Sequence, residues 1–207
     1  MSSWQKEAGK TIVSKNTKIG VLASQGAFAE HIETLKKLDV ETVEIRLPGQ
    51  LKDIDGLVLP GGESTTISLL MNYYNLMAEI ARMAESGLPL FGTCAGMILM
   101  ANNIVGNTAH PLGLMDITVR RNAFGRQVDS FETGLIIPAL GKKPFPAVFI
   151  RAPLIEKCEA SVEVLATLEN GSIVAARQGK MIVSAFHPEL TDDLRFHRYF
   201  LDIVREK

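Results

Sequence analysis

The sequence predicts a three-layer α/β fold, with a mainly parallel central sheet, helices on both faces of that sheet, and a second half that is richer in strand. In the first half, short apolar runs alternate with segments whose apolar residues recur at helical spacing, which is the pattern of βαβ units. After about Gly113 this rhythm changes, and several short strand-like runs follow one another. The 207 residues suffice for one such domain with a substantial core.

The first expected element follows a polar stretch. Residues 1–17 show no sustained period, so we interpret them as an extension, or as a segment added in cloning, and expect a single domain over residues 18–207. A strand begins at Lys18, and a loop at 24–26 joins it to a helix. Gln25 is therefore expected at the carboxyl end of this strand.

The other elements of the first half end at glycine and proline. Pro60-Gly61-Gly62 stops a buried strand, and Thr93-Cys94-Ala95-Gly96 breaks another strand into a helix, so Cys94 lies on a strand-to-helix turn. The expected strands are 18–23, 43–47, 56–59 and 90–92, and the expected helices are 28–38, 64–86 with Ser64 as its cap, and one after Cys94.

The second half predicts strands at 117–119, 147–150, 162–168, 172–176 and 181–186, and a helix from about residue 191. The Asn-Gly pair at 170–171 is a hairpin signal between two of these strands. The last strand runs directly into His187-Pro188-Glu189.

The composition excludes several classes of function. A net charge of -1 leaves no basic surface for phosphates, which argues against nucleic acid as a partner. No apolar run approaches the ~20 residues of a membrane helix, and no signal peptide is recognisable, so we expect a cytoplasmic protein. The two cysteines, Cys94 and Cys158, form neither a disulfide framework nor a zinc-binding pattern, and no metal site is expected.

Three motifs follow strands, where ligands bind in open α/β sheets. Cys94 has the setting of a nucleophile, because a helix N-terminus and a nearby imidazole both favour a thiolate, and the flanking Gly92 and Gly96 permit a tight turn. The backbone N–H of Ala95 then faces an oxyanion, and the side-chain-free Gly61-Gly62 turn offers a second donor. In the alternative interpretation, Cys94 is only a small hydrophobic residue in a helix.

His187 and Glu189 are two residues apart. If strand geometry persists through Pro188, both side chains point to one face and Glu189 orients the imidazole. Taken alone, such a pair is more often a turn with a solvated carboxylate. The other histidines lack a comparable setting and are interpreted as structural or surface residues: His31, His110 and His197.

Two further residues have alternative interpretations. Cys158 has acids on both sides, which disfavour a thiolate, so it is not expected to be catalytic. The segment 61–64 has the glycines of a phosphate loop, but it has no P-loop lysine, and Glu63 would repel an anion. An amino-group substrate suits Glu63 better, although Glu63 also fits the first turn of a helix.

Together, Gly92-Thr93-Cys94-Ala95-Gly96 and His187-Pro188-Glu189 resemble the class I glutamine amidotransferases, whose nucleophile turn reads G-x-C-x-G and whose base reads H-P-E. The segments 20–26, 60–65, 120–125 and 149–153 further resemble the glutaminase subunits of pyridoxal 5'-phosphate synthase. The resemblance runs from Lys18 nearly to the C-terminus.

This resemblance implies a flavodoxin-like fold and a triad of Cys94, His187 and Glu189 that hydrolyses glutamine to glutamate and ammonia through a glutamyl thioester. It implies oxyanion donors at Gly62 and Ala95, with Gln25 nearby. The glutamine contacts that it implies are Gly61, Gly62, Glu63, Arg121, Ile150 and Arg151. Two charged surface side chains are the alternative for the arginines.

The resemblance also implies a partner. This is a barrel-shaped synthase subunit that condenses a pentose phosphate with a triose phosphate and consumes the ammonia. Pyridoxal phosphate is then the product of the assembly, and this chain needs no cofactor. Three alternatives remain at this point: a glutaminase of another biosynthetic pathway, a cysteine hydrolase or stress protein of a related fold, and a catalytically idle regulatory subunit.

Overall fold

The computed structural model describes residues 17–106, 110–121, 123 and 130–206. Almost all of the expected N-terminal extension therefore lies outside the described residues. The strands are β1 (Lys18–Leu22), β2 (Glu41–Ile45), β3 (Gly56–Leu59), β4 (Leu90–Thr93), β5 (Ala101–Val105), β6 (Met115–Arg120), β7 (Ser130–Leu135), β8 (Phe145–Ile150), β9 (Leu154–Cys158), β10 (Glu163–Thr167), β11 (Ile173–Gln178) and β12 (Met181–Ser184). The helices are α1 (Phe28–Lys36), α2 (Ser64–Tyr73), α3 (Leu76–Glu85), α4 (Ala95–Met100) and α5 (Arg195–Arg205), with short 3-10 helices at Pro48–Leu51, Pro138–Leu140 and Pro188–Leu190.

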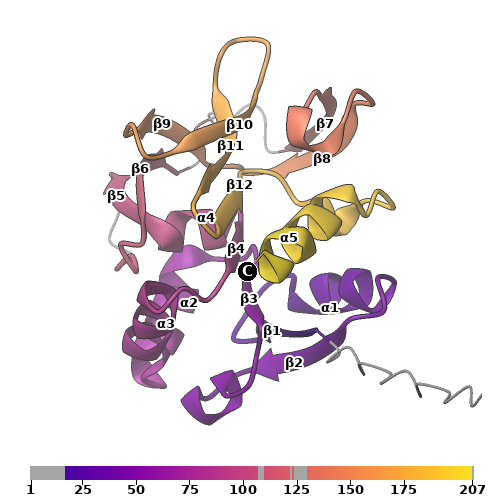
Figure 1. The fold of residues 1–207 in the computed structure, drawn as a ribbon. Helices are drawn as coiled ribbons and strands as arrows, with labels where there is room; N and C mark the ends of the chain where they lie inside the picture. Colours follow the sequence, from indigo (N-terminus) through magenta and orange to yellow (C-terminus); the bar gives the residue numbers. More distant parts are fainter. Residues whose placement is uncertain (1–16, 107–109, 122, 124–129, 207) are drawn as a thin grey trace, which may run out of the picture.

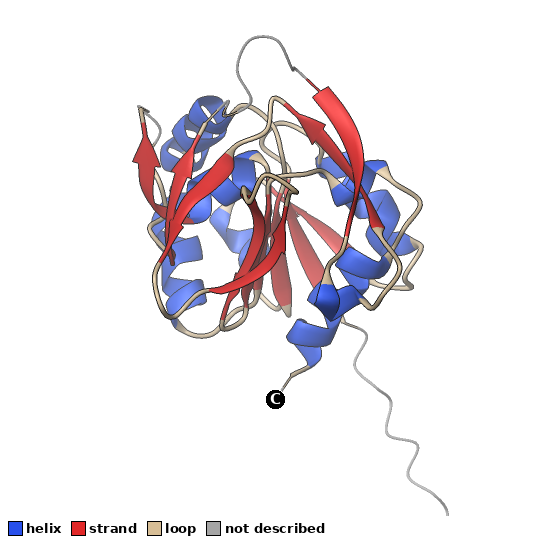
Figure 2. Ribbon diagram, turned by 90° about the horizontal axis from the view of Figure 1, so that it is seen from above, coloured by secondary structure: helices blue, strands red, loops and turns tan. Residues whose placement is uncertain are grey.

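Five parallel strands form the centre of the molecule, in the order β2-β1-β3-β4-β12. This is the 2-1-3-4-5 order of flavodoxin-like sheets, in which ligands bind at the carboxyl ends of the strands. Helices α1 and α5 lie on one side of these strands, and α2 and α3 lie on the other (Figure 1). The view from above shows helices flanking the strands on both sides (Figure 2). The predicted three-layer architecture is confirmed.

The second half of the chain extends this sheet mostly with antiparallel strands. Beyond β12, the order continues as β11-β9-β6-β5, with β10 paired to β11, and every new contact except the parallel β5–β6 pair is antiparallel. Strands β7 and β8 form a separate antiparallel pair. The predicted strand-rich second half is confirmed.

An aromatic cluster holds α1 and α5 against the sheet. Phe91 of β4 is fully buried, and its ring centroid lies 5.5 Å from those of Phe196 and Phe200 in α5. The same ring contacts His31 of α1 at 5.8 Å and His197 of α5 at 5.5 Å. Strand β4 is buried along its whole length, as expected for a central parallel strand covered on both faces.

The structure corrects several predicted boundaries. The helix expected over 64–86 is two helices, because Asn75 adopts a left-handed conformation with φ 58°. The cap of the first is Glu63 rather than Ser64, since the Glu63 carboxylate accepts hydrogen bonds from the first-turn amides. Leu47 lies beyond β2 and is 51% exposed, because a 3-10 helix begins at the next residue. The C-terminal helix begins at Arg195, a few residues later than expected.

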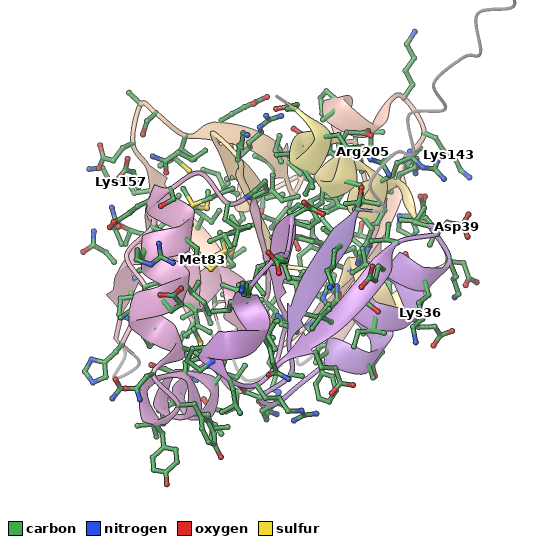
Figure 3. The ribbon with its side chains drawn as sticks, turned by 60° about the horizontal axis from the view of Figure 1, so that its bottom comes forward. Lys36, Asp39, Met83, Lys143, Lys157 and Arg205 are labelled. Atoms are coloured by element: carbon green, nitrogen blue, oxygen red, sulfur yellow. The ribbon has the colours of Figure 1, made fainter. Side chains whose placement is uncertain are left out.

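Charged side chains lie at the periphery. Lys36, Asp39, Lys143 and Lys157 are exposed and project away from the body of the molecule (Figure 3). Within the described ranges, no helix combines the length and the apolar character that crossing a membrane requires.

The glycine at the start of α4 sets how closely this helix approaches β3. A Cβ atom on Gly96 would lie 1.9 Å from the carbonyl oxygen of Leu59. We expect Gly96→Ala to lower the free energy of unfolding by about 3 kcal/mol, because a backbone carbonyl cannot give way as a side chain can. Urea denaturation measures this change.

Gly49 provides the matched control, because nothing lies within 4 Å of an added Cβ atom there. We expect Gly49→Ala to change the unfolding free energy by no more than about 0.5 kcal/mol. Equal stability of the two variants would contradict the argument.

Candidate active site

Cys94 lies between β4 and α4 in a strained backbone conformation, with φ 47° and ψ -99°. A non-glycine residue in such a region costs about 1–3 kcal/mol, so the surrounding structure must hold it. The Cys94 amide donates to the carbonyl of Ser184 at 2.8 Å. Gly92 and Gly96 pack together so closely that a Cβ atom on Gly92 would lie 2.7 Å from the Gly96 carbonyl carbon. The structure thus places Cys94 on the strand-to-helix turn that the sequence indicates.

His187 and Glu189 follow β12 and meet as a buried pair. His187 Nδ1 lies 2.7 Å from Glu189 Oε1, and the residues are only 7% and 6% exposed. The condition that strand geometry persists through Pro188 was wrong, because Pro188–Leu190 forms a 3-10 turn. The tight turn brings the two side chains together by a different route.

The electrostatics of this pair favour a protonated His187. Burial lowers the pKa of His187, but hydrogen bonds to Cys94 and Glu189 and the charges of these groups raise it to about 10. Burial raises the pKa of Glu189, but His31 and His187 keep it below its ordinary value. The imidazolium of His187 therefore lies between the Glu189 carboxylate and Cys94.

The glycine turn after β3 lies directly against these residues. A Cβ atom on Gly61 would lie 2.4 Å from the His187 Cε1 atom and 3.3 Å from the Cys94 Cβ atom. The Gly61 amide donates to Thr93 Oγ1 at 3.0 Å, and the Gly61 carbonyl accepts from the Ala27 amide at 3.0 Å. No side chain fits at Gly61, and its peptide groups are fixed on both sides.

Two backbone amides remain available beside Cys94. Ala95 is the first residue of α4, where N–H groups have no partner within the helix. Within the described ranges, no protein group accepts a hydrogen bond from the Gly62 amide. Gln25 lies next to it and positions it, because Gln25 Oε1 accepts from the Glu63 amide at 2.8 Å.

A cavity of about 290 Å³ opens above Cys94. This volume lies at the small end of ligand sites and suits a molecule the size of an amino acid. Its lining contains Gln25, Gly62, Glu63, Ser64, Cys94, Ile98, Arg121, Ile150, Arg151 and His187. Each expected substrate contact except Gly61 therefore lines one cavity. A larger open groove of about 1000 Å³ between β7 and the start of α5 has neither cysteine nor histidine in its lining.

Glu63 and Arg121 are already paired across the mouth of the cavity. Arg121 Nη2 lies 3.0 Å from Glu63 Oε1, and the Glu63 carboxylate also accepts from the amides of Thr65 at 3.1 Å and Thr66 at 2.7 Å. Burial raises the pKa of Glu63, but the backbone and side-chain hydrogen bonds from Thr66 and Thr65 lower it to about 2, so the carboxylate is ionised at neutral pH. Glu63 therefore caps α2. Its carboxylate already binds first-turn amides and Arg121 before any substrate arrives.

Arg151 follows directly after β8 and also lines the cavity. It is exposed and adopts a positive φ of 42°, which is uncommon for an arginine. Its neighbour Ile150 is 37% exposed. This bend presents both residues to the cavity.

Three residues that the sequence did not link to the site lie behind Cys94, His187 and Glu189. They are His31, Thr93 and His197. His31 and His197 are 0% exposed, so the surface alternative was wrong for both, whereas His110 is exposed. His31 Nε2 lies 3.3 Å from Glu189 Oε2 and 3.1 Å from Thr93 Oγ1. The signal was present, because both buried histidines fall on the apolar stripes of their helices. Cys158 lies in β9 outside the cavity, and burial raises the pKa of its thiol.

Known proteins that match this chain define the class of protein to which it belongs. A crystal structure described as a glutamine amidotransferase matches this chain with a TM-score of 0.86 and 49% identity, covering 90% of this chain and 98% of that one. The chain belongs to the SNO glutamine amidotransferase family, which it matches over residues 21–206. The resemblance drawn from the motifs and the predicted class of enzyme are both confirmed.

The relatives point to one branch of this family. Pyridoxal 5'-phosphate synthase subunit PdxT of Moorella thermoacetica is 58% identical over 187 residues, which cover 90% of this chain and 99% of the relative. The protein of the same name from Carboxydothermus hydrogenoformans is 59% identical over 187 residues, covering 90% of this chain and 97% of the relative.

The raised pKa of His187 leads to a prediction. Because the folded value of about 10 exceeds the ordinary 6.5, protonation stabilises the fold below about pH 6.5, and this contribution is lost as the pH rises through 10. We expect His187 to be protonated at pH 8. Glu189→Gln should lower the pKa of His187, because the glutamine carries no negative charge to oppose the effect of burial. NMR titration of labelled imidazoles measures both values.

Glu169→Gln, in the exposed 168–172 loop, is the control and should leave the His187 titration unchanged. A wild-type pKa near 6.5, or a value unaffected by Glu189→Gln, would count against a charge-coupled triad.

Proposed function

We propose that the chain hydrolyses L-glutamine to L-glutamate and ammonia with Cys94 as the nucleophile, and that the ammonia serves pyridoxal 5'-phosphate synthesis. The observation that carries this proposal is the contact of Cys94, on its strained turn, with the buried His187–Glu189 pair at the base of a small cavity. Family membership independently supports the same class of reaction.

The first half-reaction makes a thioester. The Cys94 thiolate attacks the carboxamide carbon of glutamine, and the amides of Gly62 and Ala95 donate to the oxyanion. The imidazolium of His187 then transfers a proton to the amide nitrogen, the C–N bond breaks, and ammonia leaves. One oxyanion donor is typically worth about 10²- to 10³-fold in rate.

The second half-reaction restores the enzyme. Neutral His187 removes a proton from water, which attacks the thioester carbon. The C–S bond breaks, glutamate leaves, and the Cys94 thiolate is regenerated beside an imidazolium. Glu189 keeps the imidazole oriented in both halves and remains ionised.

Glutamine recognition is proposed for both walls of the cavity. Arg151 and Arg121 suit the α-carboxylate, and Glu63 suits the α-amino group, because opposite charges then face opposite ends of the zwitterion. The backbone at Ile150 would contact the substrate chain, and Gly61 would act by holding the adjoining Gly62 in place. Gln25 acts on the oxyanion side through its hydrogen bond to the Glu63 amide.

A barrel-shaped synthase subunit is the proposed ammonia acceptor, condensing a pentose phosphate with a triose phosphate. The names of the relatives support a role as one subunit of a larger enzyme. The glutaminase unit is proposed to extend from residue 18 and to need no cofactor. We place the reaction in the cytoplasm, where a thiolate nucleophile stays reduced; both cysteines are free.

Replacing the nucleophile tests the mechanism. We expect Cys94→Ala to reduce ammonia release by at least about 10⁴-fold. We also expect Cys94→Gly to be inactive but more stable than Cys94→Ala by about 1 kcal/mol, because glycine adopts the positive φ without strain. A coupled glutamate assay and urea unfolding measure the two effects.

Cys158→Ala is the control and should keep full activity, because its thiol lies outside the cavity. Ammonia release by Cys94→Ala at the wild-type rate would exclude this thiolate mechanism.

The proposed ammonia acceptor is tested by adding the barrel-type synthase subunit to the assay. We expect the isolated chain to release ammonia slowly, and the barrel-type synthase to increase the rate by at least about tenfold, because ammonia made without an acceptor is wasted. Ammonia and pyridoxal phosphate are measured together, with the synthase present or omitted. Equal turnover in both mixtures, or stimulation only by a synthase of another pathway, would contradict the assignment of the partner.

A further inference from the structure

Two buried histidines lie behind the triad, and no step of the mechanism uses them. His31 of α1 and His197 of α5 are fully buried, and His31 Nδ1 lies 2.9 Å from His197 Nε2. They join the two helices that cover one face of the sheet (Figure 1). Buried imidazoles cost free energy unless their nitrogens are paired, so a role for this pair is expected.

His31 faces the half of the Glu189 carboxylate that His187 leaves free. Glu189 Oε1 pairs with His187, whereas Oε2 is buried and has no hydrogen-bond partner within the described ranges. His31 Nε2 lies 3.3 Å from this oxygen and hydrogen-bonds to Thr93 Oγ1 at 3.1 Å. A nitrogen lone pair at that distance would repel the carboxylate, so Nε2 carries the hydrogen. Thr93 Oγ1 accepts it, and the positive charge of this hydrogen lies close to Oε2.

His197, at the far end of this row of hydrogen-bonded side chains, requires the same arrangement. With the hydrogen on His31 Nε2, His31 Nδ1 accepts from His197 Nε2, and His197 Nδ1 is left as a lone pair. That atom is buried without a partner, which costs less for a lone pair than for an N–H group. The reverse arrangement would leave a buried N–H on His197 Nδ1 with no acceptor.

Burial favours the neutral form of both His31 and His197. Burial lowers the pKa of His31, Glu189 and Glu30 oppose this effect, and the charge of His187 adds to it. Burial also lowers the pKa of His197 well below its ordinary value, and His31 acts in the same direction. The neutral form of His31, with its tautomer fixed by His197, therefore presents an N–H group to the buried side of Glu189.

We propose that His31 is a positioning residue for glutamine hydrolysis, whose Nε2–H group lies against the free oxygen of Glu189 and offsets its negative charge, with His197 fixing the tautomer of His31. This inference rests on the triad of the proposed function. Thr93 extends the effect, because the same hydroxyl oxygen accepts from the Gly61 amide. One imidazole thus lies between the base and the glycine turn on the oxyanion side.

Loss of the His31 N–H group should change the pH at which Glu189 takes up a proton. Burial raises the pKa of Glu189, so without His31 the carboxylate should take up a proton at higher pH and no longer support His187. Other ionisable groups near Glu189 are Glu30, Glu33 and Lys37 of α1 and Asp192, which line a small cavity with it, and His187 on its own turn. None of these replaces the His31 N–H group beside Oε2.

The test compares three variants of the full chain, assayed with the synthase subunit present. His31→Met keeps the volume but has no donor, and His31→Gln places an amide N–H near the position of Nε2. Phe196→Leu is the control, because it weakens the aromatic cluster without contacting the triad. The readouts are kcat, KM for glutamine, and the acid limb of the pH profile of kcat/KM.

We expect His31→Met to lower kcat on the order of tenfold, to leave KM within about twofold, and to move the acid limb to higher pH. His31→Gln should recover most of kcat and the wild-type profile. The proposal is overturned if His31→Met behaves as Phe196→Leu does, or if folded His31→Gln is as impaired as His31→Met.

Should His31→Met fail to fold by circular dichroism, His31→Asn replaces it, because its shorter amide reaches toward His197 but not Glu189. Asn and Gln variants of equal activity would then overturn the proposal. An active Cys94→Ala variant would instead overturn the triad itself, so the two failures are distinguishable.

Discussion

The strained turn at Cys94 depends on parallel pairing along β4. Strand β4 lies between β3 and β12, and the Cys94 amide bonds to the residue that ends β12. Close packing of α4 on β3 through Gly96 prevents the helix from moving away and relaxing the turn. The positive φ is therefore a property of the sheet and the helix together, and Cys94 lies at the same sheet edge as His187 and Glu189.

Burial of charge has a second structural consequence. Glu189 and His187 are both nearly inaccessible to water, and such groups are tolerated only when they are paired. The surrounding polar atoms belong to four separate segments, at Thr93, Gly61, α1 and α5. The polar network around His187 and Glu189 therefore also links α1 to α5, which makes this site a part of the core.

Features fixed by local sequence were predictable. Glycines around Cys94 and after β3 mark turns wherever the chain goes next, so the sequence indicated both turns and the motifs beside them. The break between α2 and α3 was not predictable, because the apolar spacing continues through Asn75. The cap at Glu63 depends on one carboxylate turning back toward the helix, which spacing does not reveal. The pairing of His31 with His197 joins residues 166 positions apart, and only tertiary structure brings them together.

The position of β12 also determines when the site comes into existence. Leu90 of β4 pairs with Met181 of β12, and His187 follows this strand directly. A nascent chain that ends just after Cys94 contains β1 to β4 but has neither the fifth parallel strand nor His187. Contacts so distant in sequence form late and slowly. His187 therefore reaches Cys94 only after β12 has joined the sheet beside β4.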